Sequence, residues 1–193
     1  ISQKYLIYLC DHTVYCYGLG DRQRGIVGVY MLAVVTGRMF GVIMTSPSNL
    51  TEFYKPNMVN WKIEASELKG RSFIEIDVLG PKVDLHLDKI DFNAEYPQDV
   101  VYIRTNQKLY YETLRNPLYI SKFPKWAHVH QWRLFQVAWL RLMTPTQSLR
   151  QELNTVLLHI VKDMKSEFNA WKQLSNTGCC TRKTLCNGIQ CPN

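Results

Sequence analysis

The segment of residues 17–25, YGLGDRQRG, constrains the fold more than any other part of the chain. It follows a short apolar run at residues 5–9, which is typical of a strand buried on both faces of a sheet. It precedes residues 26–35, which are apolar nearly all round and predict a buried helix. A connection of this kind, from a buried strand into a helix, is where α/β domains commonly bind ligands. We therefore predict a binding site at this segment.

Five residues of the segment are the candidate ligand-binding residues: Gly18, Gly20, Asp21, Arg22 and Arg24. The two glycines would permit a turn with positive φ and a close approach of the backbone to a ligand. The helix that follows would direct its free N–H groups and the positive end of its dipole at an anion, and the charged residues would add specificity. The alternative interpretation is that the glycines only form a tight corner between strand and helix.

The segment matches neither of the two familiar phosphate-binding fingerprints. The dinucleotide pattern needs a third glycine where this chain has Gln23. The Walker pattern needs Lys followed by Ser or Thr where this chain has Ile26 and Val27. The sequence therefore disfavours an ordinary dehydrogenase or nucleotidase, and since it shows no haem, flavin or metal signature, we expect no cofactor.

Composition limits the other classes of partner. The chain has 193 residues, of which 46% are hydrophobic and 20% charged, so it is long enough for one globular domain with a tail. No apolar run is long enough for a transmembrane helix, so no membrane partner is predicted. The net charge of +7 comes from scattered basic residues without a recognisable motif, which argues against a nucleic-acid partner.

The cysteines favour an oxidising, secreted setting. There are six, and together with a glycosylation sequon that begins at Asn49 they predict disulfides rather than a zinc site. Because the first residue is Ile1 rather than Met, we also expect that an N-terminal segment has been removed. One pair of cysteines flanks the loop before the glycine segment and either pairs locally or reaches into the tail. The pair is Cys10 and Cys16, and the tail contains Cys179, Cys180, Cys186 and Cys191.

The remaining patterns predict an α/β fold with a mostly parallel sheet. The first helix should end at residues 36–38, where Gly37 is a natural C-terminal residue, and residues 39–44 form the second strand. A strand, a helix and a strand within about 40 residues indicate a right-handed βαβ unit. Further strands are predicted at residues 72–79 and 100–104, a short helix at 108–114, and a core helix at 132–142.

Two groups of polar residues resemble metal or catalytic sites. Asp84, His86 and Asp88 alternate with apolar residues and would share one face of a strand, although a polar face in water is the favoured interpretation. His128 and His130 would share a face if that segment is extended. We predict no metal site at either group.

The last helix has the clearest pattern in the chain. Thr144 and Pro145 supply a predicted N-cap and first helical residue, and the helix should continue to about residue 174. The helix carries a stripe of apolar residues that is longer than one small domain can cover. Part of this stripe should therefore contact the tail or another subunit, and we predict a homo-oligomer. The residues of the stripe are Leu149, Leu153, Val156, Leu157, Ile160, Met164, Phe168 and Trp171.

Together these motifs resemble the N-terminal half of the GDP-fucose-dependent fucosyltransferases, which are glycosyltransferases built from two Rossmann domains. The resemblance rests on the cysteine before the glycine segment, residues 18–25, residues 36–38, residues 134–135, and residues 144–145 with the Leu-rich helix after them. It implies a Rossmann-like domain over residues 1–161, followed by a helix extension and cysteine-rich tail over residues 162–193. In the family the glycine segment borders the cleft near the donor diphosphate, and this half largely forms the acceptor side.

The sequence departs from the family after the resemblance ends. In proteins of the family, the second half begins with a strand that carries a His-x-Arg-x-Gly-Asp type motif, and this motif binds GDP-fucose. This sequence has no such motif. We therefore predict a secreted half-domain without the donor-binding domain, repurposed to bind a glycan or a small-molecule ligand, with no catalytic residue assigned. The alternatives are a secreted enzyme of the oxygenase or luciferase type that acts on a small apolar molecule, a residual glycosyltransferase, or an assembly protein.

Overall fold

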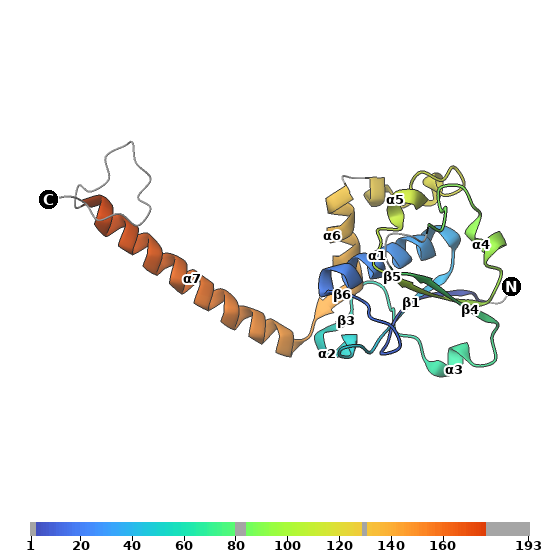
Figure 1. Ribbon diagram of the computed structural model, residues 1–193, viewed down its shortest axis with the longest axis horizontal. Coiled ribbons are helices and arrows are strands. Elements are labelled where there is room, and N and C mark those ends of the chain that lie inside the picture. Colours follow the sequence, from blue (N-terminus) through green and yellow to red (C-terminus); the bar gives the residue numbers. More distant parts are fainter. Residues whose placement is uncertain (1–2, 80–83, 129–130, 177–193) are drawn as a thin grey trace. The chain divides into compact units, whose positions relative to one another are not determined.

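The computed structural model describes residues 3–79, 84–128 and 131–176. The chain divides into two compact units, Ile1–Thr146 and Gln147–Asn193 (Figure 1). The domain boundary predicted at residue 161 stays a prediction. The first unit contains the sheet and all the short helices, and the described part of the second unit is one long helix.

The centre of the first unit is a sheet of four parallel strands in the order β2-β1-β5-β4. Each residue of β1 is buried, as the apolar run predicted, and Tyr5 pairs with Met39 on one side and with Val100 on the other. The predicted α/β class with a mostly parallel sheet is therefore confirmed. The strands are β1 (Tyr5–Cys10), β2 (Met39–Met44), β4 (Phe73–Val78) and β5 (Val100–Thr105).

Helix α1 (Leu19–Thr36) connects β1 to β2 and packs against β1, β2 and β5 (Figure 1). Its middle and C-terminal turns are buried because their side chains are apolar on every face. The helix ends where the sequence predicted, since Gly37 takes the left-handed conformation with φ 70° and its amide donates to the carbonyl of Ala33.

The glycines at the start of α1 do not act as predicted. Gly18 is the N-cap with φ −72°, Gly20 lies inside the first turn, and the residue with positive φ is Tyr17 at 62°. The glycine that allows a close approach is Gly25, where a Cβ atom would overlap the carbonyl of Thr105 and lie 2.7 Å from the ring of Tyr8. The absence of a side chain at this position lets α1 cross directly over β1 and β5.

Short elements surround this core. Helix α6 (Gln131–Leu142) confirms the core helix predicted at residues 132–142, and α5 (Tyr110–Thr113) is the short helix predicted at residues 108–114. A separate antiparallel pair is formed by β3 (Tyr54–Pro56) and β6 (Met143–Pro145). The helices are α2 (Leu50–Phe53), α3 (Ala65–Leu68), α4 (Phe92–Glu95), α5 (Tyr110–Thr113) and α6 (Gln131–Leu142), with 3-10 turns η1 (Ile120–Lys122) and η2 (Lys125–His128).

The strand predicted from the alternation near residue 86 does not form over the described residues 84–88. His86 has φ 51°, and its amide donates to the carboxylate of Asp84 at 2.8 Å, so a local turn replaces the extended backbone. Leu85 and Leu87 are nevertheless buried while Asp84 and His86 are exposed. The alternating pattern therefore predicted correctly which side chains are buried, but the strand that it predicted is wrong.

Helix α7 (Gln147–Asn176) forms the described part of the second unit. It starts later than predicted because residues 143–145 belong to β6, where Thr144 pairs with Lys55, and the amide of Thr146 donates to the carbonyl of Phe53. The helix then continues without a break through residue 161. Among the helices that the structure describes, none is long and apolar enough to cross a membrane.

Candidate functional site

The strand order reverses between β1 and β5, so the carboxyl ends of these two strands are the expected place for a ligand. From β1 the chain passes through α1 to β2 on one side, and it later adds β5 and β4 on the other side. Ligands of open α/β sheets bind where the strand order reverses in this way. Asp11 and the start of α1 lie at this edge, together with Arg104 and Thr105 at the end of β5.

A buried arginine organises this edge. The side chain of Arg104 is only 8% exposed, and its guanidinium donates to Asp11 at 2.8 and 3.3 Å and to Glu75 at 3.2 Å. Burial alone would raise the pKa of the Asp11 carboxyl, but hydrogen bonds from Arg104 and Thr13 outweigh it and lower the pKa to about 2. Arg104 therefore ties the segment after β1 to β5 and β4.

Sequence reasoning did not find this cluster. Arg104 was predicted only as the end of a buried strand, and Asp11 lies 93 positions away from it in sequence. The available signal was a charged residue at or just after the end of each of two apolar runs. Because carboxyl ends of parallel strands meet at one edge of the sheet, these residues could have been placed together.

The loop between β1 and α1 is closed by a disulfide between Cys10 and Cys16, whose Cα atoms lie 6.0 Å apart. Both cysteines are buried. This confirms the local one of the two pairings predicted for them, while Cys179, Cys180, Cys186 and Cys191 lie outside the described residues. The loop carries Tyr15 and Tyr17, which are exposed and whose ring centroids are 5.3 Å apart.

Removing this disulfide should destabilise the first unit moderately. In the double variant Cys10→Ala/Cys16→Ala, we expect the free energy of unfolding to fall by about 2 kcal/mol, since the bridge closes a short loop. Chemical denaturation of the variant and the wild-type protein under non-reducing conditions measures the difference. Equal midpoints would show that Asp11 and Arg104 hold the loop without the bridge.

The structure brings the five predicted ligand-binding residues together over the first turns of α1, but they differ in role. Gly18 caps the helix and Gly20 faces open space. Asp21 forms an ion pair with Arg24, whose Nε also donates to the carbonyl of Gly20 at 3.4 Å. The Nε atom of Arg22 is buried and makes no hydrogen bond among the described residues. Of the five, Arg24 lines the pocket at this end of the fold.

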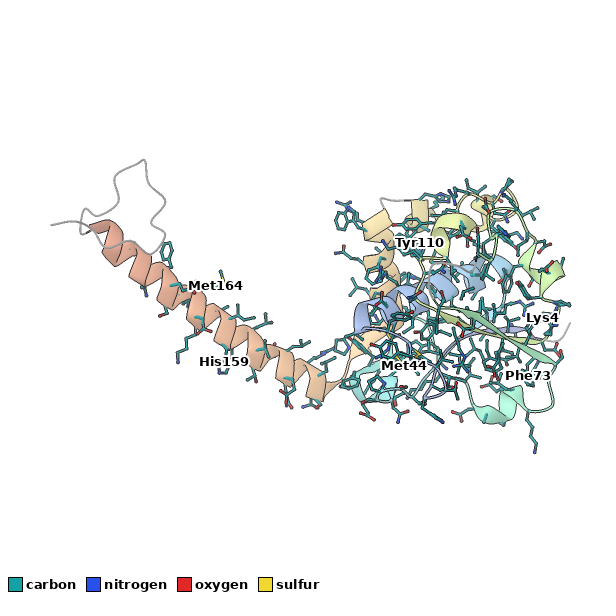
Figure 2. The ribbon with its side chains drawn as sticks, viewed as in Figure 1. Lys4, Met44, Phe73, Tyr110, His159 and Met164 are labelled. Atoms are coloured by element: carbon teal, nitrogen blue, oxygen red, sulfur yellow. A yellow bond between two sulfur atoms is a disulfide. The ribbon has the colours of Figure 1, made fainter. Side chains whose placement is uncertain are left out.

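The pocket has a volume of about 500 Å³ and lies against α1, α5 and α6. Figure 2 shows Tyr110 of α5 in this region, beside α6. Its walls combine aromatic rings with positive charge, so they offer apolar contact area together with groups that attract an anion. The lining residues are Arg24, Lys108, Tyr110, Tyr111, Trp132, Phe135 and Gln136.

Contacts among the lining residues fix the positions of several of them. The Nζ atom of Lys108 lies 3.5 Å from the hydroxyl of Tyr111 and 5.3 Å from the centre of its ring. The rings of Tyr110 and Tyr111 have their centroids 4.7 Å apart. Burial raises the pKa of the Tyr110 phenol although nearby Arg24 opposes the rise, so this hydroxyl stays neutral and can donate a hydrogen bond.

Among the residues that the structure describes, no group of three or more His, Cys, Asp or Glu side chains could hold a metal ion. His86 Nδ1 lies 3.2 Å from Asp84 Oδ2, and both side chains are mostly exposed. His128 lies in η2, and His130 falls outside the described residues. Asn49 is exposed at the start of α2, and its glycosylation stays a prediction.

Comparison with known proteins supports the fold. No protein-family model and no curated protein sequence matches the chain. Among solved structures, it is similar to a mutant of the Arabidopsis thaliana fucosyltransferase FUT1 in complex with GDP, with 12% sequence identity and a TM-score of 0.57. The match covers 75% of this chain and 38% of FUT1, so the chain spans about two fifths of that enzyme. The chain therefore has a Rossmann-like, fucosyltransferase-like fold.

Proposed function

We propose that this chain is a secreted fucosyltransferase-like domain that binds a glycan in the pocket beside α1, and that it does not transfer fucose by itself. The observation that carries the proposal is the combination of four aromatic residues with two cations, Arg24 and Lys108, in one pocket. The disulfide between Cys10 and Cys16 and the sequon at Asn49 support secretion. Binding rather than transfer is supported by helix α7, which continues past residue 161, where the resemblance would place the strand with the His-x-Arg-x-Gly-Asp type motif.

The pocket chemistry favours a glycan that carries a negative charge. A sugar ring can pack its C–H face against an aromatic ring such as Trp132, which is 52% exposed. A carboxylate or sulfate group would accept charge-assisted hydrogen bonds from Lys108 and Arg24. Asp21 already neutralises part of the charge of Arg24, so we assign the larger electrostatic contribution to Lys108. The similar structure, FUT1, was solved with GDP, which supports a small-molecule ligand for a fold of this kind.

Pocket substitutions should weaken binding without unfolding the domain. We expect Trp132→Ala and Lys108→Gln each to raise the dissociation constant of an acidic glycan at least about tenfold, which corresponds to about 1.4 kcal/mol. A glycan array with matched neutral, sialylated and sulfated members identifies the ligand, and calorimetry measures its affinity. Lys89→Gln, which changes an exposed lysine that does not line the pocket, is the matched control.

Two results would contradict the proposal. One is binding that Lys89→Gln weakens as much as Lys108→Gln, because this would indicate general attraction of an anion to a basic protein. The other is tight binding of GDP-fucose with transfer of fucose to an acceptor, because this would restore the enzyme interpretation.

The aromatic lining also supports a second candidate, a secreted enzyme that acts on a small apolar molecule. Phe135 and Trp132 would hold such a molecule through contact area alone. This candidate predicts a neutral aromatic ligand that Trp132→Ala weakens and Lys108→Gln leaves unchanged. The two variants therefore distinguish the candidates in one experiment.

A further inference from the structure

Helix α7 carries an apolar stripe that repeats every 11 residues. An 11-residue repeat corresponds to about 3.67 residues per turn, so the stripe stays on one face of the helix along its length. Met164 is 65% exposed, and Figure 2 shows it on a different side of the helix from His159. The other members are also well exposed, except for the less exposed Leu149. The repeating pairs are Leu149 with Ile160, Leu153 with Met164, and Leu157 with Phe168.

Charges are segregated on the two sides of this stripe. With about 100° per residue, three carboxylates lie about 50–110° to one side of its centre, and three cations lie about 50–110° to the other side. We name these the acidic edge and the basic edge. All six side chains are exposed, and Nζ of Lys172 lies 5.7 Å from the ring centre of Phe168. The acidic edge is Glu152, Asp163 and Glu167, and the basic edge is Arg150, Lys165 and Lys172.

We propose that α7 pairs in parallel with α7 of a second copy of this chain. A two-fold axis along the helices brings the acidic edge of each copy against the basic edge of the other. An antiparallel pair would instead bring acidic edge against acidic edge and basic against basic, because its two-fold axis is perpendicular to the helices. The charge pattern therefore selects the parallel direction, while burial of the apolar stripe supplies the stabilisation.

The axial positions of the charges agree with this arrangement. In a parallel, in-register pair, Asp163 of one copy and Lys165 of the other are two residues apart, or about 3 Å along the axis. Glu152 and Arg150 have the same offset, and Glu167 lies five residues from Lys172. Ion pairs at an exposed edge contribute little stability each, so their role here is to fix direction and register.

The full-length chain tests the proposal through its mass and its cross-links. We expect light scattering to give the mass of two copies. In a mixture of unlabelled and ¹⁵N-labelled protein, a zero-length carboxyl-to-amine reagent should link Asp163 to Lys165 and Glu167 to Lys172 between copies. Mass spectrometry separates these links from links within one copy, because only the former contain one labelled and one unlabelled peptide.

A pair of neighbouring substitutions provides the matched control. Leu157 lies in the stripe, whereas Leu158 points about 100° away from Leu157 and lies outside the stripe. Leu157→Lys should raise the dissociation constant of the pair at least about tenfold, and Leu158→Lys should leave it within about twofold. A single-copy mass at all concentrations would overturn the proposal, as would equal effects of the two substitutions. Dimers without links between the acidic and basic edges would overturn the parallel direction.

Discussion

Gly25→Ala should lower the free energy of unfolding by more than about 3 kcal/mol, because the added methyl group has no room. It would overlap the backbone carbonyl of Thr105 and come within 2.7 Å of the ring of Tyr8. Neither group can rotate away, since Thr105 ends β5 and Tyr8 is fully buried in β1. Relief would require α1 to lift from the sheet, with loss of packing along its buried face. Chemical denaturation followed by circular dichroism measures the effect.

Gly20→Ala is the matched control for this prediction. Nothing lies within 4 Å of a Cβ atom at Gly20, so alanine should be neutral or stabilise the helix by up to about 1 kcal/mol through its higher helix propensity. If both variants unfold at the same denaturant concentration as the wild-type protein, the close packing of α1 on the sheet is wrong. If Gly20→Ala keeps its stability but loses ligand affinity, the site extends to the first turn of α1, as the sequence predicted.

The contrast between these two glycines shows what sequence reasoning could find. The strand, the helix and its C-terminal residue Gly37 follow from local patterns, and the structure confirms all three. Position 25 must be glycine because a side chain there would overlap Thr105, which is 80 positions later in the chain. No local pattern distinguishes Gly25 from Gly20, because both are followed or preceded by charged residues. The choice between them requires the arrangement of the strands.

The two wrong predictions of secondary structure have different causes. Alternation of apolar and polar residues near His86 predicted a strand, but capping of the turn by Asp84 stabilises another backbone conformation with the same burial. Thr144 and Pro145 have the chemistry of a helix start, yet pairing of β6 with β3 takes them into a strand. In the first case a hydrogen bond between residues two positions apart decides the conformation, and in the second case pairing with a distant strand does.

The candidate site was predicted only in part. Arg24 was named from the glycine segment, and it lines the pocket. Lys108 and Tyr110 lie in a segment predicted as a short helix, and Trp132 starts a segment predicted as core. Their convergence depends on how α5 and α6 pack beside α1, which no spacing in the sequence specifies. The sequence therefore indicated the region of the fold that carries the site, but not its lining.

Asp11→Asn should have the second large effect on stability, about 3 kcal/mol or more at neutral pH, because it leaves a buried cation without its main partner. Arg104 is buried, and the remaining carboxylate, Glu75, is half exposed and makes a single hydrogen bond of 3.2 Å with it. Asparagine keeps the shape of the side chain and removes its charge. Thermal or chemical denaturation gives the difference in free energy of unfolding, and Glu95→Gln, at an exposed carboxylate, controls for the loss of one negative charge.

The pH dependence of that difference identifies its source. The pKa of Asp11 is lowered to about 2 in the folded protein, whereas a carboxyl of this kind in an unfolded chain titrates near pH 4. The ionised carboxylate stabilises the folded state in full when the pH is above the pKa of the unfolded chain. This stabilisation is lost as the pH falls through the pKa of the folded protein. The difference in free energy of unfolding between the wild-type protein and Asp11→Asn should therefore disappear as the pH falls from about 4 to about 2. A difference that stays constant down to pH 2 would show that asparagine disturbs the packing of the loop, and that the ion pair with Arg104 is not what holds it.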